Sequence, residues 1–80
     1  MTDEQASNYL RDLGDLVKFS ARTARQRRDS SSTEADRTFE AGRLTAYYEV
    51  VSLMQQQAAA FGIGLTQLSL DDVDPDRDLL

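Results

Sequence analysis

The sequence predicts an all-α protein, an antiparallel two-helix hairpin that pairs with a second copy as a homodimeric four-helix bundle. Three observations predict this fold. Apolar residues recur every three or four positions over two long stretches. A short serine-rich stretch separates them, and the only proline, Pro75, lies beyond both. The second stretch also carries more apolar residues than a single hairpin interface can cover.

The first helix is expected over about residues 3–28. Acidic residues, Asp3 and Glu4, stand near its start and several arginines near its end. This order complements the helix dipole, which favours negative charge at the N-terminus and positive charge at the C-terminus. The apolar face of this helix consists of Ala6, Leu10, Leu13, Val17, Ala21 and Ala24.

Residues 29–31 form the predicted turn, because aspartate and serine side chains compete for backbone hydrogen bonds. Ser31 and Glu34 have the spacing of a capping box, and Ser32 is an equally good N-cap. The second helix is therefore expected from about residue 32 to residue 61. Gly62 then supplies the residue type that closes a helix in the left-handed conformation.

The second helix carries two apolar seams. The first has the 3-4 spacing of a coiled-coil seam, and the second is interrupted by Arg43 and Gln57. A hairpin has one internal interface, so a second copy would cover what is left. We expect the dimer interface to contain Leu44, Tyr47, Val50, Val51, Leu53, Met54 and Phe61. The alternatives are a monomer, with residues 63–70 as a third packing element, and a complex with another protein.

The C-terminal part divides into two segments. Residues 63–70 hold four large apolar side chains and are expected to pack back on the hairpin, which completes a domain over residues 1–70. Residues 71–80 hold five aspartates and one arginine, a net charge of −4, and are predicted to be an irregular, disordered acidic tail. Their alternating acids resemble the start of an EF-hand loop, but Arg77 stands where that loop needs glycine.

The amino-acid composition excludes several kinds of catalytic and metal-binding site. The 80 residues include neither cysteine nor histidine, which removes the commonest general base, the commonest transition-metal ligand and any disulfide. We therefore expect no catalytic residues, no cofactor and no metal site, and the protein is predicted not to be an enzyme. No apolar run approaches the ~20 residues of a membrane span, so we expect no membrane association and a cytoplasmic location.

Seven residues are candidates for binding partners. Phe19 and Tyr48 point away from the seams, and Arg43 stands where an apolar residue would pack better, so these three are candidate contacts to a protein partner. The remaining four could contact a polyanion and are Arg22, Arg25, Arg27 and Arg28. Because residues 1–70 carry 8 basic and 9 acidic groups, a net of −1, bulk electrostatic binding to nucleic acid is disfavoured.

The expected function is a small non-enzymatic protein-interaction module or regulator that acts as a helical-hairpin dimer. One alternative is a nucleic-acid-associated small regulator that uses the Arg22–Arg28 end. Another is an acidic inhibitor or immunity-type protein that blocks a basic enzyme site with its carboxylates. In a hairpin the chain ends lie ~40 Å from the turn, so the acidic tail is expected beside the arginines of the second copy.

Overall fold

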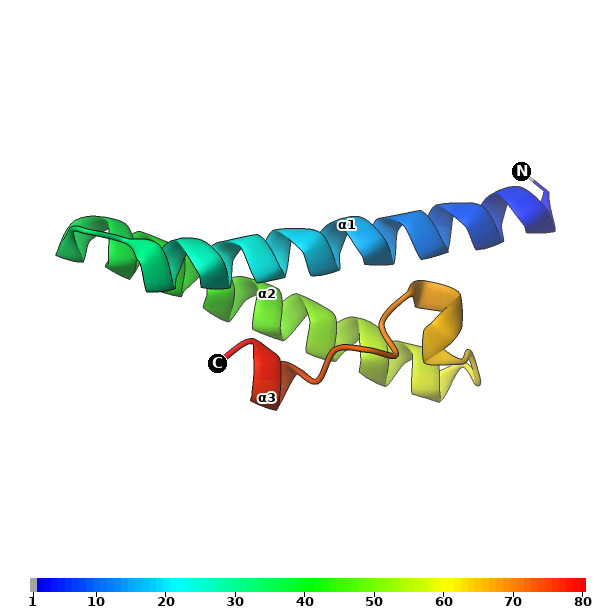
Figure 1. The fold of residues 1–80 in the computed structure, drawn as a ribbon. Coiled ribbons are helices and arrows are strands. Elements are labelled where there is room, and N and C mark those ends of the chain that lie inside the picture. The colour runs from blue at the N-terminus through cyan, green and yellow to red at the C-terminus, as the bar shows by residue number, and fades with distance from the viewer. Residues whose placement is uncertain (1) are drawn as a thin grey trace.

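The computed structural model describes residues 2–80, and no strand occurs among them. Helices α1 (Asp3–Ser30) and α2 (Glu34–Ala60) pack against each other as an antiparallel pair (Figure 1). A 3₁₀-helix, η1 (Leu65–Leu68), and a single helical turn, α3 (Pro75–Asp78), follow. The predicted all-α hairpin is confirmed. Figure 1 also shows that the chain after α2 turns back and runs along the hairpin.

Helix α1 begins with a capping box that the sequence analysis missed. The amide of Gln5 donates to Thr2 Oγ1 at 3.0 Å, and the amide of Thr2 donates to Gln5 Oε1 at 2.8 Å. These two bonds satisfy amides that have no partner within the helix. At the other end the helix continues to Ser30, two residues beyond the prediction, with Arg27 and Arg28 in its last turn.

Helix α2 begins one or two residues later than predicted. Its N-cap is Thr33, whose hydroxyl accepts from the amide of Asp36 at 3.1 Å, in place of Ser31 or Ser32. Its end follows the prediction, because Gly62 has a φ of 69°. The amide of Ile63 then donates to the carbonyl of Ala58 at 2.8 Å, which closes the helix and redirects the chain.

The C-terminal segment, residues 63–80, supplies much of the core. Leu68, Leu70, Val73 and Leu79 are buried at 6 % exposure or less. They pack against a row of small and aliphatic residues from the two long helices, namely Ala21, Ala24, Leu44, Val51 and Ala58. Since the buried residues of α1 are the small ones Gly14, Ala21 and Ala24, the C-terminal segment supplies much of the bulk of the core.

The prediction of a disordered tail over residues 71–80 is therefore wrong. This segment contains α3, capped by Asp74, whose carboxylate accepts from the amides of Asp76 and Arg77 at 3.1 and 3.4 Å. Pro75 occupies the first turn, where its fixed φ suits a helix and its missing amide costs nothing. Two isolated apolar residues, Val73 and Leu79, anchor the segment. The high aspartate content masked this pattern.

One glycine lets the C-terminal segment approach α1. Gly14 is buried, and a Cβ atom at this position would lie 1.7 Å from the carbonyl oxygen of Leu68. No side chain fits in that space, so the backbone of η1 rests directly on α1 at Gly14. The contact sets the course of the chain from η1 onward.

Candidate functional site

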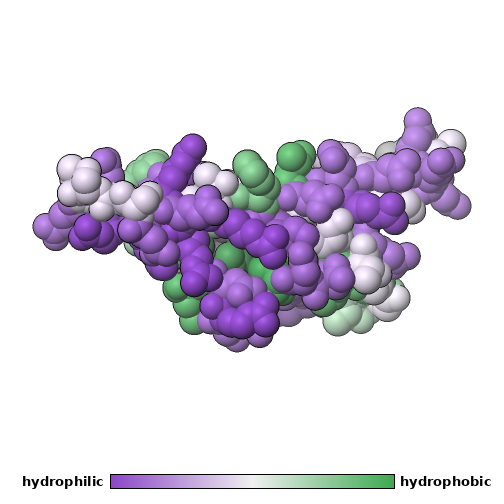
Figure 2. Space-filling model, viewed as in Figure 1, coloured by the Kyte–Doolittle hydropathy of each residue, from purple (hydrophilic) through white to green (hydrophobic). Residues whose placement is uncertain are grey.

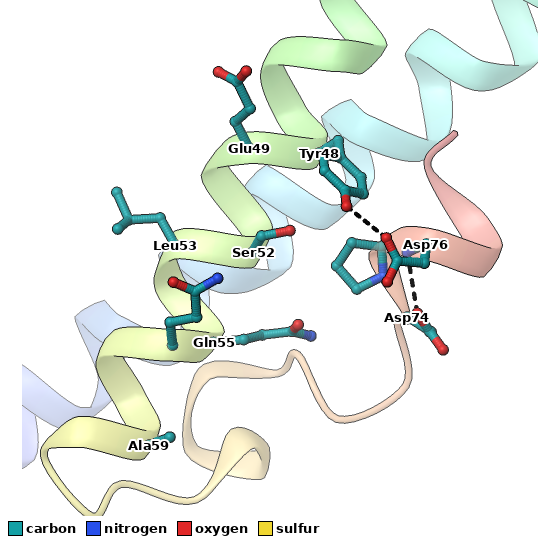
Figure 3. Close-up of a pocket in the computed structure, with 10 residues that line it drawn as sticks. Tyr48, Glu49, Ser52, Leu53, Gln55, Ala59, Asp74 and Asp76 are labelled. Atoms are coloured by element: carbon teal, nitrogen blue, oxygen red, sulfur yellow. Dashed lines mark hydrogen bonds between the residues drawn. The ribbon is translucent and has the colours of Figure 1, made fainter.

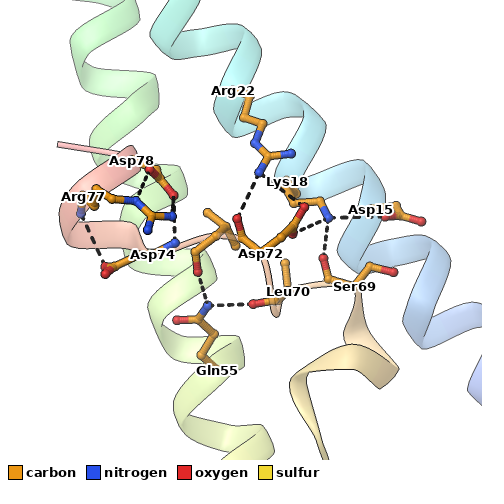
Figure 4. A network of polar contacts seen from close by, with 11 residues as sticks. Asp15, Lys18, Arg22, Gln55, Ser69, Leu70, Asp72, Asp74, Arg77 and Asp78 are labelled. Carbon is orange, nitrogen blue, oxygen red and sulfur yellow. Dashed lines mark hydrogen bonds and ion pairs between the residues drawn. The ribbon is translucent and has the colours of Figure 1, made fainter.

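Lys18 holds the C-terminal segment from α1. Its ammonium donates to the carbonyl of Ser69 at 2.6 Å and to Asp72 Oδ1 at 2.8 Å, and its side chain is only 13 % exposed (Figure 4). Arg22 adds a bond from Nη2 to the carbonyl of Asp72 at 3.3 Å. Lys18 and Arg22 of α1 thus bind a segment around Asp72, about 50 residues later in the sequence.

Further contacts hold the rest of the segment. Gln55 Nε2 donates to the carbonyls of Leu70 and Val73 at 3.1 and 2.9 Å (Figure 4), and Arg25 Nη1 donates to the carbonyl of Asp78 at 2.8 Å. The hydroxyl of Tyr48 donates to Asp76 Oδ1 at 2.5 Å, as Figure 3 shows. The C-terminal segment is therefore bonded to both long helices.

These contacts shift proton affinities. The hydrogen bond from Lys18, together with the charges of Lys18 and Arg22, lowers the pKa of the Asp72 carboxyl. The hydrogen bond from Arg77 and the backbone amide of Asp74 lower the pKa of Asp78. The hydrogen bond to Asp76 and its negative charge raise the pKa of Tyr48, because ionisation would place two anions side by side.

The predicted polyanion contacts are partly occupied within the chain. Arg22 and Arg25 bind the C-terminal segment, and Arg28 pairs with Asp29 at 3.0 Å. Arg27 is exposed. The expectation that the acidic residues lie beside the arginines of a second copy is corrected here, because the chain reverses at Gly62 and brings them to its own α1.

The three candidate contacts to a protein partner differ in access. Phe19 is 69 % exposed on α1. Arg43 pairs with the nearly buried Glu40 at 2.7 Å and lies 5.8 Å from the centre of the Tyr47 ring. Tyr48 is half-buried against α3 through its bond to Asp76, so it acts in the fold of the single chain.

The predicted dimer-interface residues fall into two groups. Leu44 and Val51 are buried within the chain, at 2 % and 0 % exposure, so a second copy cannot reach them in the folded hairpin. For these two residues the structure corrects the prediction, since the C-terminal segment and α1 cover them. Tyr47 and Met54 are half-buried, and the exposed members are Val50, Leu53 and Phe61.

A continuous exposed stripe runs the length of α2. Its eight positions are spaced by three or four residues, so they share one face of the helix. All eight are exposed and none is charged, and Figure 3 shows Leu53 projecting from α2 away from α3. We call this set the α2 stripe, which consists of Ala35, Phe39, Gly42, Ala46, Val50, Leu53, Gln57 and Ala60.

Helix α1 also exposes apolar side chains. Tyr9, Leu13, Leu16 and Phe19 are between 36 % and 69 % exposed. In Figure 2 hydrophobic side chains project from the middle of α1 on the side away from α2, while the surface around α3 is mainly hydrophilic. Monomeric proteins seldom leave so many large apolar groups together in water.

The acidic residues of the C-terminal segment are mostly engaged within the fold. Asp72, Asp74, Asp76 and Asp78 each have a separate structural role, and among residues 2–80 no group of three or more potential ligands could hold a metal ion. An open groove of about 660 Å³ lies between α2 and α3, lined partly by Glu49, Ser52 and Asp76 (Figure 3). Its lining includes carboxylates, amides and hydroxyls, and the Tyr48 hydroxyl there is bonded to Asp76.

The fold and its surfaces define an all-α helical hairpin whose groove is filled by its own C-terminal segment. No helix within residues 2–80 has both the length and the apolar character needed to cross a membrane. Comparison of the chain with protein-family models, curated proteins and solved structures finds no match in any of the three.

Proposed function

We propose that the protein is a small non-enzymatic interaction module that acts as a homodimer of helical hairpins. The observation that carries the proposal is the α2 stripe. The internal interface of the hairpin is already filled by residues of the same chain, yet α2 still exposes Phe39, Val50 and Leu53 along a stripe that itself holds no charged residue. A long apolar face of this kind typically marks an interface between proteins.

Each of the two exposed apolar surfaces, one on α1 and one on α2, has its own role in this proposal. The α2 stripe joins two copies, and the apolar side chains of α1 remain available to a further protein partner. Phe19 is the central candidate there, because exposed aromatic side chains provide large contact areas at interfaces. A dimer of this kind presents the partner-binding surface twice.

The two alternative functions gain no comparable support. A nucleic-acid-associated regulator needs free cationic side chains, but Arg22 and Arg25 are engaged with the C-terminal segment. An inhibitor that blocks a basic enzyme site needs free carboxylates, but Asp72 and Asp76 bind Lys18 and Tyr48.

Light scattering at micromolar concentration tests the proposal. Wild type is expected at about twice the chain mass of 9.0 kDa. Val50→Asp and Leu53→Asp should lower the mass to that of one chain and leave the helical circular dichroism unchanged, because neither side chain is buried in the hairpin. Thr45→Asp, also exposed on α2 but outside the stripe, is the matched control and should remain dimeric. A wild-type protein that is monomeric at these concentrations would contradict the proposal.

A further inference from the structure

We propose that the two copies pair through α2 alone, antiparallel, with the centre of the contact near residue 48. This inference rests on the dimer proposed above and adds its surface, direction and register. It follows from the positions of small and large side chains in the α2 stripe, from Gly42 and from the exposed area of the chain.

Within residues 2–80, Gly42 makes no close contact that would require a glycine. It lies in the interior of α2, where glycine destabilises a helix relative to alanine. Among residues 2–80, a methyl group at this position would meet no atom within 4 Å apart from the adjacent helical backbone. Gly14 is explained by its contact with Leu68, but nothing in the single chain explains Gly42. A glycine on an exposed helix face allows a second helix to approach closely.

The α2 stripe is complementary to itself when one copy is reversed. Positions at the same distance from residue 48, to within one residue, then face each other across the contact. Gly42 of one copy lies opposite Leu53 of the other, and Ala46 lies opposite Val50. The outer pairs are Phe39 with Gln57, and Ala35 with Ala60. In the two central pairs a small residue faces a branched one, which is the arrangement that fills space between close helices.

The parallel arrangement lacks this complementarity. Identical positions would then face each other, so that Gly42 would lie opposite Gly42 and Leu53 opposite Leu53. The first pair leaves a gap and the second pushes the helices apart. Two helices in contact cannot move closer to fill the gap at Gly42 and move apart to relieve the clash at Leu53 at the same time. The antiparallel pair therefore packs better than the parallel pair.

The exposed area has the size that such a contact requires. The chain has an accessible surface of 5457 Å², whereas a compact monomer of its mass has about 4,900 Å². The surplus of roughly 600 Å² approaches the ~800 Å² that each partner buries in a standard interface. It arises from the elongated shape, 46 × 21 × 16 Å, which leaves the whole of α2 open along one side.

Cross-linking can determine the direction, since the natural chain has no cysteine. Ala35→Cys and Ala60→Cys are prepared as separate proteins, mixed, allowed to exchange subunits and treated with a short bismaleimide. The antiparallel register predicts a covalent dimer in the mixture and little in either protein alone, because two copies of residue 35 are about 37 Å apart. Gln26→Cys, exposed on α1, is the control for random collision.

The outcomes separate this inference from the dimer itself. Covalent dimers from Ala35→Cys alone would show parallel helices and overturn the inference. A dimeric mass by light scattering without any cross-link at these positions would place the contact elsewhere and also overturn it, while the proposed dimer would stand. A monomeric mass would contradict both.

A size exchange tests the register. Gly42→Leu is accommodated in the single chain, but it should weaken dimerisation about tenfold or more, because two large side chains then compete for one space. Adding Leu53→Ala to the same chain should restore dimerisation toward the wild-type level. If Gly42→Leu dimerises like wild type, or if the second change weakens the dimer further, the proposed register is wrong.

Discussion

At the scale of single residues, Gly14 and Lys18 determine where the C-terminal segment lies. Gly14 provides the space for the backbone of η1, and Lys18 bonds both the carbonyl of Ser69 and the carboxylate of Asp72. The Lys18 side chain is only 13 % exposed, so these two partners take the place of most of the water around its ammonium group. Both residues lie one turn apart on α1 and contact the same stretch of chain.

Gly14→Ala should destabilise the fold. The added methyl group would overlap the Leu68 carbonyl, and neither backbone can move without disturbing the other packing around it. We expect the free energy of unfolding to fall by about 2 kcal/mol or more, measured by urea denaturation. Gly64→Ala is the control, because its Cβ would meet only Thr66 Oγ1 at 3.7 Å, and it should change stability by about 0.5 kcal/mol at most. Equal effects of the two changes would contradict the close contact.

At the scale of elements, the C-terminal segment acts as the third layer of the fold. It follows the groove between α1 and α2, buries four aliphatic side chains and bonds to polar side chains of both helices. Four of its five aspartates have individual roles, as an ion-pair partner, a helix cap or hydrogen-bond acceptors, and these are Asp72, Asp74, Asp76 and Asp78. The segment is thus held by apolar burial, and its polar contacts set its position.

The contact between Asp72 and Lys18 predicts a pH dependence. Since the pKa of Asp72 is lower in the folded than in the unfolded chain, this contact stabilises the fold above the unfolded pKa of about 3.9. The contribution is lost as the pH falls through the folded pKa. Asp72→Asn should therefore reduce the difference in unfolding free energy between pH 6 and pH 3, measured by urea denaturation. Asp71→Asn, at the exposed neighbouring position, is the control and should keep the wild-type difference. If Asp72→Asn also shows a difference as large as in wild type, the proposed role of Asp72 is contradicted.

At the scale of the whole molecule, the chain is long and thin with a modest core. The nine buried apolar residues include three alanines, so each larger side chain in the core contributes a substantial share of stability. Four of the six larger ones come from the C-terminal segment. The hairpin therefore depends on residues 63–80 for its packing, and a second copy would add burial on the outer side of α2.

Deleting residues 71–80 should strongly destabilise the protein. Removing Val73 and Leu79 loses about 4 kcal/mol of apolar burial, which is a large part of the stability of a small domain. Thermal denaturation should show a lower Tm than wild type, and the dye ANS should bind to the exposed core. Deleting only Leu80, which is 68 % exposed, is the control and should have little effect. A truncated protein with the wild-type Tm would show that the segment is dispensable.

The same truncation bears on the nucleic-acid alternative. It frees Arg22 and Arg25 and removes net negative charge, so binding to heparin should increase at low salt. Unchanged binding would remove the remaining support for a polyanion site at this end of the hairpin.

The two long helices, their antiparallel pairing and the presence of two apolar seams on α2 could be predicted from the sequence, whereas which seam residues stay exposed could not. These features depend on local patterns, namely apolar periodicity, capping residues and the glycine at position 62, which act within a few residues of one another. The first residue of α2 could not be predicted as precisely, because Ser31, Ser32 and Thr33 are all residue types that cap helices and the choice between them depends on neighbouring side chains.

Only the tertiary structure decided the path of residues 63–80 and the roles of the residues that they contact. Lys18 and Asp72 are 54 positions apart, and no periodicity connects them. A lone glycine within a helix, such as Gly14, is a signal of close packing, but it does not identify the neighbour. Val73 and Leu79 are isolated among aspartates, so their burial depends on a groove that exists only after α1 and α2 have packed together.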